Sequence, residues 1–206
     1  MNNTPKEYLS WSQYSLFKRS PKLYRDCYIY GKRMESIYMD FGKKVAESIE
    51  SGELVGNSEL DHINTFLPKD PKNSREYELS TNYYSGKGKE LVKIPLYGKF
   101  DRFLLKKKIL REVKTGTVAW TQNKVDSFEQ ITFYCFMIWN EYGFIPKNIE
   151  LIWLPTKREG NEIVLTGEIR TFKTERKLID IVKIGVEIKK VWIGINQLCA
   201  EEASKL

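Results

Sequence analysis

Asp101, Glu112 and Lys114 are the residues whose types and spacing could support hydrolytic chemistry. Glu112 and Lys114 are two positions apart, so on a strand their side chains share one face. If Asp101 lies opposite Glu112 on a neighbouring strand, two like charges stand with their Cβ atoms roughly 5 Å apart and repel each other. A cation between the carboxylates removes this repulsion, and hard oxygen ligands suit Mg²⁺ or Mn²⁺. We therefore predict a divalent-metal site at these residues.

The stretches that carry these residues have the composition of two paired strands. Aromatic and β-branched residues dominate 97–103 and 109–116, which is typical of strands. The lysines between them have side chains that do not have to be buried in a core, so the two strands are expected to form a hairpin. A turn centred between Lys106 and Lys107 places the two carboxylates directly opposite each other. Shifting the pairing by one residue separates them, whereas a shift of two keeps them on one face. The alternative is a solvated hairpin face with mixed charges.

The composition is that of a globular protein with an excess of positive charge. The chain has 206 residues, of which 41% are hydrophobic and 13% aromatic, and its formal net charge is +7. We expect one domain over 1–206, with a core at about 36–155 and a C-terminal strand and helix over 162–204. The positive charge suits a polyanionic partner such as nucleic acid.

Cysteine usage and hydropathy favour an intracellular protein. Cys27, Cys135 and Cys199 are odd in number and far apart, so we expect no disulfide framework or zinc ribbon, and a reducing compartment. The N-terminus lacks the apolar run of a signal peptide, and the most apolar stretch, 131–139, is too short for a bilayer of roughly 30 Å. We expect a cytoplasmic protein with no membrane partner.

Capping patterns and apolar periodicity predict the helices. Capping boxes at Ser10–Gln13 and Asp126–Glu129 each predict the start of a helix. Apolar residues recur every four positions over 36–49, and a longer amphipathic pattern predicts a helix over about 174–204.

The order of the remaining elements predicts the fold class. A buried strand is expected to end at Pro155, and the polar segment 56–74, which holds the single histidine, His62, is expected to be a surface excursion without a catalytic role. Besides the hairpin, strands are predicted at 75–84, 91–95, 149–154 and 162–172. Together with the helices, this order predicts an α/β core with a mixed sheet flanked by helices.

Three short motifs occur in the order found in one superfamily. They are Gly98-x-x-Asp101, Glu112-x-Lys114-Thr115-Gly116 and Gln130-x-x-x-Tyr134. With Leu9–Ser12 and Pro21–Tyr24 they resemble the PD-(D/E)XK nuclease superfamily, and within it the RecB-like and phage-exonuclease branch that includes the CRISPR-adaptation exonucleases. The resemblance covers about 10–155. It implies a restriction-endonuclease-like core (αβββαβ) with an extra N-terminal helix and a long C-terminal helix.

The resemblance implies a role for each residue of the hairpin. Asp101 and Glu112 are expected to ligate Mg²⁺ or Mn²⁺, and the Val113 carbonyl adds an oxygen. Lys114 is expected to orient or deprotonate the attacking water and to stabilise charge on the phosphate. The alternative for Lys114 is a simple salt bridge to one of the carboxylates.

The downstream helix supplies two further residues in this family. Gln130 and Tyr134 are four apart and share a helix face, and the resemblance implies that they contact the scissile strand or support the site. The alternative is that the tyrosine packs in the core while the glutamine is exposed.

The sequence departs from the family at two places. Many RecB-like members have a histidine where this chain has Ala46, so we predict that Glu47, or else Glu50, supplies the missing metal ligand; the alternative is that both are solvated helix residues. Members with an iron–sulfur cluster have a cysteine before the first-motif proline and three more near the C-terminus. Here Ser20 takes the first of these positions and Cys199 alone lies near the end, so no cluster is predicted.

Basic and aromatic residues are interleaved in two segments, a mixture suited to phosphate contacts and base stacking. Solvated faces have similar compositions. The residues that we expect to contact DNA are Lys18, Arg19, Lys22, Trp120 and Lys124.

These observations predict a metal-dependent deoxyribonuclease, and the resemblance favours an exonuclease in recombination, repair or phage DNA processing. Its expected partners are DNA ends or single strands, with a recombination or single-strand-annealing protein as a further partner. Two alternatives stay open: a DNA-binding module whose nuclease site has decayed, as the missing histidine at Ala46 suggests, and an endonuclease on the same core.

Overall fold

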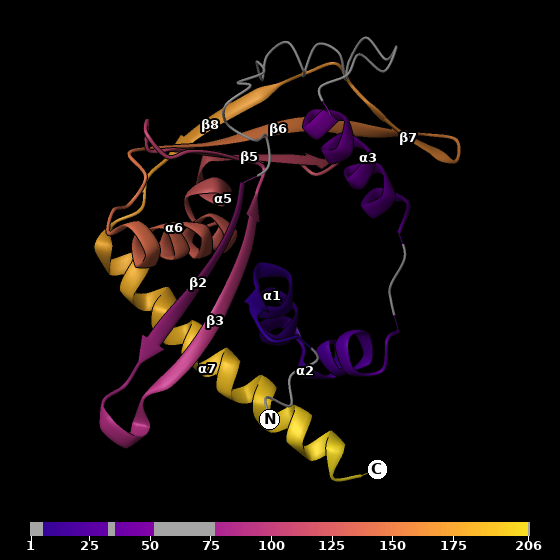
Figure 1. Cartoon of the computed structure of the whole chain (residues 1–206). Coiled ribbons are helices and arrows are strands. Elements are labelled where there is room, and N and C mark those ends of the chain that lie inside the picture. Colours follow the sequence, from indigo (N-terminus) through magenta and orange to yellow (C-terminus); the bar gives the residue numbers. More distant parts are fainter. Residues whose placement is uncertain (1–5, 33–35, 52–76, 206) are drawn as a thin grey trace.

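The computed structural model describes residues 6–32, 36–51 and 77–205. In these residues the chain forms two β-sheets with helices packed against them (Figure 1). The fold is a mixed α/β arrangement with a long C-terminal helix, which confirms the predicted fold class. The predicted excursion 56–74, with His62, lies outside the described residues.

The first sheet has three strands in the order β1-β3-β2. Its strands are β1 (Leu9–Ser10), β2 (Tyr77–Ser85) and β3 (Val92–Phe100). β2 and β3 form an antiparallel ribbon connected by a short 3-10 helix, η2 (Gly88–Glu90), whereas β1 pairs with β3 in parallel. This sheet therefore brings the N-terminal segment beside the strand that leads to Asp101.

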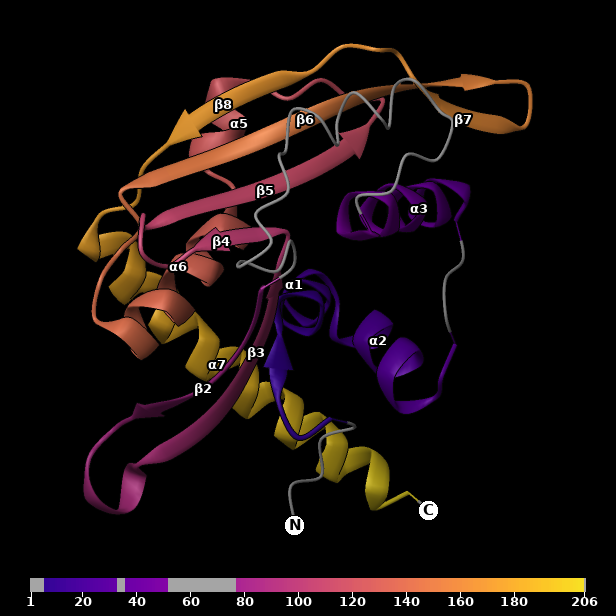
Figure 2. The same cartoon turned by 45° about the horizontal axis from the view of Figure 1, so that its top comes forward.

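The second sheet has the order β4-β5-β6-β7, and β8 pairs with β6 as well. Its strands are β4 (Arg102–Leu104), β5 (Ile109–Gly116), β6 (Asn148–Glu159), β7 (Glu162–Leu165) and β8 (Arg170–Thr174). β5 and β6 are parallel, and the crossover between them contains α5 (Gln122–Asp126) and α6 (Glu129–Tyr142). Figure 2 shows β4, β5, β6 and β8 as neighbouring strands.

The remaining helices surround the two sheets. They are α1 (Trp11–Arg19), α2 (Pro21–Tyr24), the π-helix η1 (Arg25–Ile29), α3 (Ile37–Ser51) and α7 (Leu178–Ala203). Figure 1 places α3 beside β7 and α6 beneath β5. Among the described residues, no helix combines the length and apolarity that crossing a membrane requires.

Both faces of β6 are buried, each against a different helix. Leu151 and Trp153 belong to the main core, which also contains residues of α6 and α7. Ile152 and Leu154 point the other way, into a smaller cluster with Val45 of α3. Alternate residues of a strand face opposite sides, so burial on both sides explains why this strand reads as a continuous apolar run.

The predicted hairpin has the expected register, but its first strand is interrupted. Arg102 pairs with Arg111 and Leu104 with Ile109, so the pairing is centred between Lys106 and Lys107 as expected. The predicted strand 97–103, however, breaks at Asp101, because β3 belongs to the first sheet and β4 to the second.

Two predicted boundaries are wrong for identifiable reasons. Asp126 does not cap α6: it is the last residue of α5, and its carboxylate accepts hydrogen bonds from Gln122 and Thr174, both at 2.8 Å. β6 continues past Pro155 to Glu159, because the proline carbonyl accepts a bond from the N–H of Thr166 at the start of the β6–β7 pairing. The predicted strand 162–172 is divided into β7 and β8.

The two glycines inside α7 allow close packing rather than interrupting the helix. A Cβ at Gly185 would lie 2.8 Å from a ring carbon of Phe136 on α6, and a Cβ at Gly194 would lie 2.8 Å from a ring carbon of Phe17 on α1. Both glycines therefore let an aromatic ring from a neighbouring helix rest against the backbone of α7.

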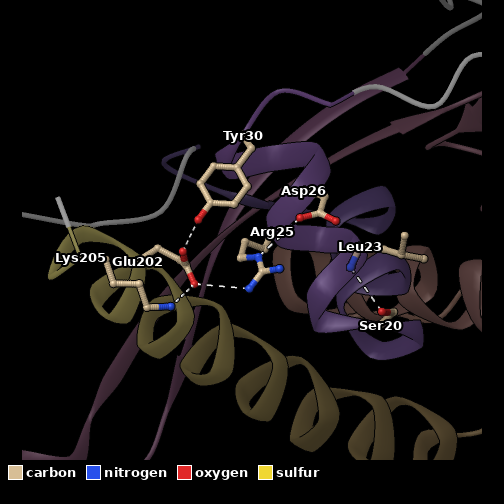
Figure 3. Close-up of polar contacts among 7 residues, drawn as sticks. All are labelled: Ser20, Leu23, Arg25, Asp26, Tyr30, Glu202 and Lys205. Atoms are coloured by element: carbon tan, nitrogen blue, oxygen red, sulfur yellow. Dashed lines mark hydrogen bonds and ion pairs between the residues drawn. The ribbon is translucent and has the colours of Figure 1, made fainter.

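A buried carboxylate joins the C-terminal end of α7 to the segment after α2 (Figure 3). Glu202 is 5% exposed and accepts a hydrogen bond from the hydroxyl of Tyr30 and one of 2.7 Å from Lys205. The Arg25 guanidinium lies 3.6 Å from the same carboxylate. These contacts tie the C-terminal end of α7 to η1 and the residue that follows it.

Ser20, which the family resemblance aligned with a cluster cysteine, serves as the N-cap of α2. Its hydroxyl oxygen accepts a hydrogen bond of 3.3 Å from the N–H of Leu23, as Figure 3 shows. A serine hydroxyl in this position satisfies one of the unpaired donors at the start of a helix. Cys199 lies buried on α7.

Glu202→Gln is expected to lower the melting temperature by about 2–5 °C at pH 7, since it removes the charge that three side chains contact. Lys205 and Tyr30 donate hydrogen bonds that hold the pKa of Glu202 below its ordinary value. Because this pKa is depressed on folding, the stabilisation is present at neutral pH and is lost as the pH falls below about 4. Thermal unfolding followed by circular dichroism at several pH values measures the difference.

The matched control is Glu201→Gln, on the exposed side of the same helical turn. An equal loss in both variants, or a Glu202→Gln loss that persists at pH 3, would contradict this account.

Candidate active site

Asp101 lies at the bend where the chain leaves the first sheet and enters the second. By the register of β4 and β5 it stands opposite Glu112. Its Oδ2 accepts a hydrogen bond of 2.7 Å from the backbone N–H of Val113. Strand β4 starts only at Arg102, so the side chain of Asp101 satisfies a donor of β5 beyond the end of that ladder.

Glu112 is the most deeply buried carboxylate of the site, with 2% of its surface exposed. Its Oε1 accepts hydrogen bonds from Lys114 Nζ at 2.6 Å and from Gln130 Nε2 at 2.8 Å. Its Oε2 is buried and has no hydrogen-bond partner among the described residues. A buried carboxylate oxygen without a partner is costly, so it requires a compensating ligand or a proton.

Gln130 and Tyr134 support the site from α6. The Gln130 amide donates to the Tyr134 hydroxyl at 2.9 Å as well as to Glu112, and the Tyr134 hydroxyl donates to the Lys99 carbonyl at 3.1 Å. Gln130 is 7% exposed and Tyr134 5%, so the alternative of an exposed glutamine is wrong. Both residues lie behind the carboxylate, where they position it.

Gly98 lets α6 approach β3 closely enough for these contacts. A Cβ at this position would lie 2.9 Å from the sulfur of Met137 on α6 and 2.9 Å from a ring carbon of Phe100. Gly98, the glycine of the first motif, therefore allows α6 to pack closely against β3.

Burial and mutual repulsion determine the charges at the site. Burial, together with the nearby carboxylate of Asp101, raises the pKa of Glu112 to about 8. Burial also raises the pKa of Asp101, against the opposing effects of Lys114 and the Val113 N–H. Burial alone would lower the pKa of Lys114, but the two carboxylates outweigh it and raise this pKa. Lys114 is therefore a firmly protonated cation beside two carboxyl groups.

The donor set of these residues suits a hard divalent cation. Asp101 and Val113 line a cavity of about 240 Å³. Glu112, whose Oε2 lacks a partner, is not among its lining residues but lies close enough to Asp101 for the charge of that carboxylate to raise its pKa. Carboxylate and carbonyl oxygens are the ligands that Mg²⁺ and Mn²⁺ prefer. In the part of the chain that the structure describes, no group of three His, Cys, Asp or Glu residues forms a ligand set.

Helix α3 forms the opposite wall of this cavity. Gly42, Val45 and Ala46 line it, so Ala46, where the family resemblance led us to expect a missing ligand, lies on the same cavity as Asp101 and offers only a methyl group. Glu47 is exposed and is not among the lining residues. Of Glu50, the structure describes the backbone only.

Lys18 and Arg19 lie in a groove between α1 and the start of α6. The groove has a volume of about 370 Å³, and its lining residues are Trp11, Ser15, Lys18, Arg19, Phe128 and Glu129. Trp120 and Lys124 lie together, with the lysine nitrogen 4.2 Å from the ring centroid. Lys22 is exposed on α2 and does not line the groove.

Two residues of this region were not found from the sequence. Phe128 is partly exposed and lies beneath Lys114. Arg176, in the segment between β8 and α7, is 7% exposed and donates to the carbonyls of Val125 and Phe128. No local pattern marks either residue, because each acquires its role from contacts across the fold.

Gln130→Ala is expected to lower the free energy of unfolding by about 1–3 kcal/mol, because it leaves the Tyr134 hydroxyl and Glu112 Oε1 with fewer partners in a buried site. Urea denaturation at pH 7 measures this loss. Gln197→Ala, at an exposed position of α7, is the control and should change stability by less than about 0.5 kcal/mol. Equal stability of the two variants would show that the Gln130 bonds do not support the site.

Comparison with known proteins gives matches only at the level of three-dimensional structure. No family model and no curated protein matches the sequence. A phage-related exonuclease from Haemophilus somnus 129PT superposes with a TM-score of 0.52 at 13% identity, over 93% of this chain and 82% of the exonuclease. The crystal structure of SSO0001 superposes with a TM-score of 0.43 at 15% identity, over 90% of this chain and 77% of that one. The chain thus shares its overall fold with a phage-related exonuclease.

Proposed function

We propose that this protein is a divalent-metal-dependent DNA nuclease of the PD-(D/E)XK type. One observation carries the proposal: Glu112 is buried opposite Asp101 with one carboxylate oxygen lacking a partner, while its other oxygen accepts a bond from Lys114. A buried carboxylate oxygen without a partner calls for a ligand or a proton, and a divalent cation between the two carboxylates supplies the ligand. The fold shared with a phage-related exonuclease supports the same reading and favours an exonuclease.

In this proposal Asp101, Glu112 and the Val113 carbonyl hold Mg²⁺ or Mn²⁺. The bound ion supplies charge neutralisation at the phosphate and a water of increased acidity. The exposed Glu47 follows the cavity-lining Ala46 on α3, and we propose it as the source of a further ligand.

Lys114 is the residue that would act directly on the substrate. Lys114 lines the cavity and its ammonium group, bound to Glu112, stays protonated, so in this proposal it stabilises negative charge on the phosphate and orients the attacking water by donating to its oxygen. Gln130 and Tyr134 keep the carboxylate of Glu112 in place during this step.

A second candidate function is a DNA-binding module that does not cut. Ala46 supports it, since the cavity wall on α3 has no ligand atom at the position that similar nucleases use. A third candidate is an endonuclease on the same core. Activity measurements distinguish the three.

The decisive experiment incubates the protein with Mg²⁺ or Mn²⁺ and three substrates: linear duplex DNA, closed circular duplex DNA and a single-stranded oligonucleotide. We expect cleavage of the substrates with ends and at least a 100-fold loss, roughly, in Glu112→Gln. Glu141→Gln, an exposed residue of α6, is the control and should remain active.

The possible results separate the candidates. Absence of cleavage with every metal and substrate would favour the non-cutting module, and cleavage of closed circles would favour the endonuclease. Asp101→Asn and Glu47→Ala, compared for the concentration of Mn²⁺ that gives half-maximal activity, show whether α3 supplies a ligand.

The raised pKa of Glu112 predicts how stability depends on pH. The pKa of Glu112 in the folded protein, about 8, lies above the ordinary carboxyl value, so protonation of Glu112 stabilises the folded state relative to the unfolded one. Without metal, this contribution is complete below about pH 4.3 and is lost as the pH rises through 8. Saturating Mn²⁺, which binds the ionised form, should raise the melting temperature at pH 8 by about 5–10 °C, and by less at pH 6.

Calorimetry with and without Mn²⁺ measures both effects. Glu112→Gln should remove most of the pH dependence between about 4.3 and 8 together with the response to metal. An unchanged response to metal in this variant would place the ion elsewhere.

A further inference from the structure

Phe128 lies between the proposed catalytic residues and the groove on α1. The nitrogen of Lys114 is 5.8 Å from the centroid of its ring. Trp120 meets the same ring edge-on at a centroid distance of 4.8 Å, and Trp11 does so at 6.3 Å. All three aromatic side chains are partly exposed, so the ring of Phe128 connects the site to an aromatic surface that solvent can reach.

This surface also carries cations suited to a phosphate backbone. Lys18 and Arg19 line the groove with Trp11 and Phe128, and Lys124 stands 4.2 Å from the ring centroid of Trp120. Aromatic faces interleaved with cations are the combination that single-stranded nucleic acids bind, since unpaired bases stack while the backbone follows the positive charge.

The backbone of Phe128 is held rigidly. Its N–H donates to the Val125 carbonyl at 3.2 Å, and its own carbonyl accepts from Arg176 Nη2 at 3.2 Å. The same Arg176 nitrogen donates to the Val125 carbonyl at 3.0 Å. A buried guanidinium therefore fixes the turn between α5 and α6, and the ring needs little ordering when a ligand binds.

We infer that Phe128 is the stacking platform for an unpaired base beside the phosphate bound at Lys114, and that the groove of Trp11, Lys18 and Arg19 receives the adjoining single strand. This inference deepens the proposed function, because it names the strand form that the same site accepts. A base in a duplex has no free face to offer, so the surface selects single-stranded DNA or an unpaired end.

Glu129 is the acidic residue of the groove, and it makes a specific contribution to binding. Its carboxylate pairs with Lys18 at 2.5 Å, and both side chains are well exposed, at 47% and 39%. Exposed pairs of this kind are weak, so an incoming phosphate can compete for the lysine. Because the ion pair must separate before Lys18 can bind a phosphate, it lowers the affinity for any single strand.

The test measures binding in a metal-free buffer with a chelator, where no cleavage occurs, by fluorescence anisotropy with a labelled oligothymidine and a matched blunt duplex. Phe128→Leu keeps an apolar side chain but removes the aromatic face, and should weaken binding of the single strand about 5- to 100-fold. Phe128→Tyr should bind like the parent protein. Glu129→Gln should strengthen binding, and the slope of log affinity against log salt should steepen by about 0.7 as Lys18 becomes available to a phosphate.

Phe144→Leu is the matched control, because this ring also has a lysine over it, Lys108 at 4.4 Å, but lies just beyond the opposite end of α6, which ends at Tyr142. It should bind both DNA forms like the parent. Melting temperatures of all variants show that each is folded.

Equal binding of the single strand by Phe128→Leu and the parent would overturn the inference, as would an equal loss for single strand and duplex. These results are independent of the nuclease proposal. Selective loss of single-strand binding in a protein that cuts nothing would support the platform and reject the nuclease, whereas cleavage without any effect of Phe128→Leu would do the reverse.

Discussion

The hydrogen bonds from Gln130 to Glu112 and to Tyr134 are the contacts on which the arrangement of the site depends. Glu112 belongs to the second sheet, whereas the carbonyl that Tyr134 reaches, that of Lys99, belongs to the first. One helix, α6, thus connects two sheets through side chains at the point where the carboxylates converge. In such a network each polar group needs a partner, so the unpaired Glu112 Oε2 is the atom at which the site requires a ligand or a proton.

The bend at Asp101 serves both sheets. A straight strand from β3 through β4 would pair with β5 over its whole length, and the ladder would take the N–H of Val113. Because the chain bends there, the side chain of Asp101 accepts that bond instead, and its carboxylate is fixed beside Glu112. The break in the predicted strand is therefore what positions one of the two carboxylates.

Only the family resemblance implied that Gln130 and Tyr134 meet Glu112 and Lys114. The register of the hairpin and the shared face within each pair could be predicted from the sequence itself, because period-two alternation and helical spacing of four are local rules. The boundary of α6 could not. Asp126 has the pattern of a cap, but Thr174, 48 residues away in the sequence, binds its carboxylate. Arg176 escaped detection for the same reason, since its partners come from α5 and α6. The sequence placed Ala46 on a helix, but only the folded structure shows that it lines a cavity.

The two glycines of α7 do not line the groove, but they affect the position of its walls. Gly185 receives Phe136 of α6 and Gly194 receives Phe17 of α1, and these are the helices that form the two walls of the groove. The glycines are nine residues apart, or about 14 Å along an α-helix. Both helices that wall the groove thus rest against the backbone of α7, so a side chain added at either glycine would displace one of them without any change in the residues that line the groove.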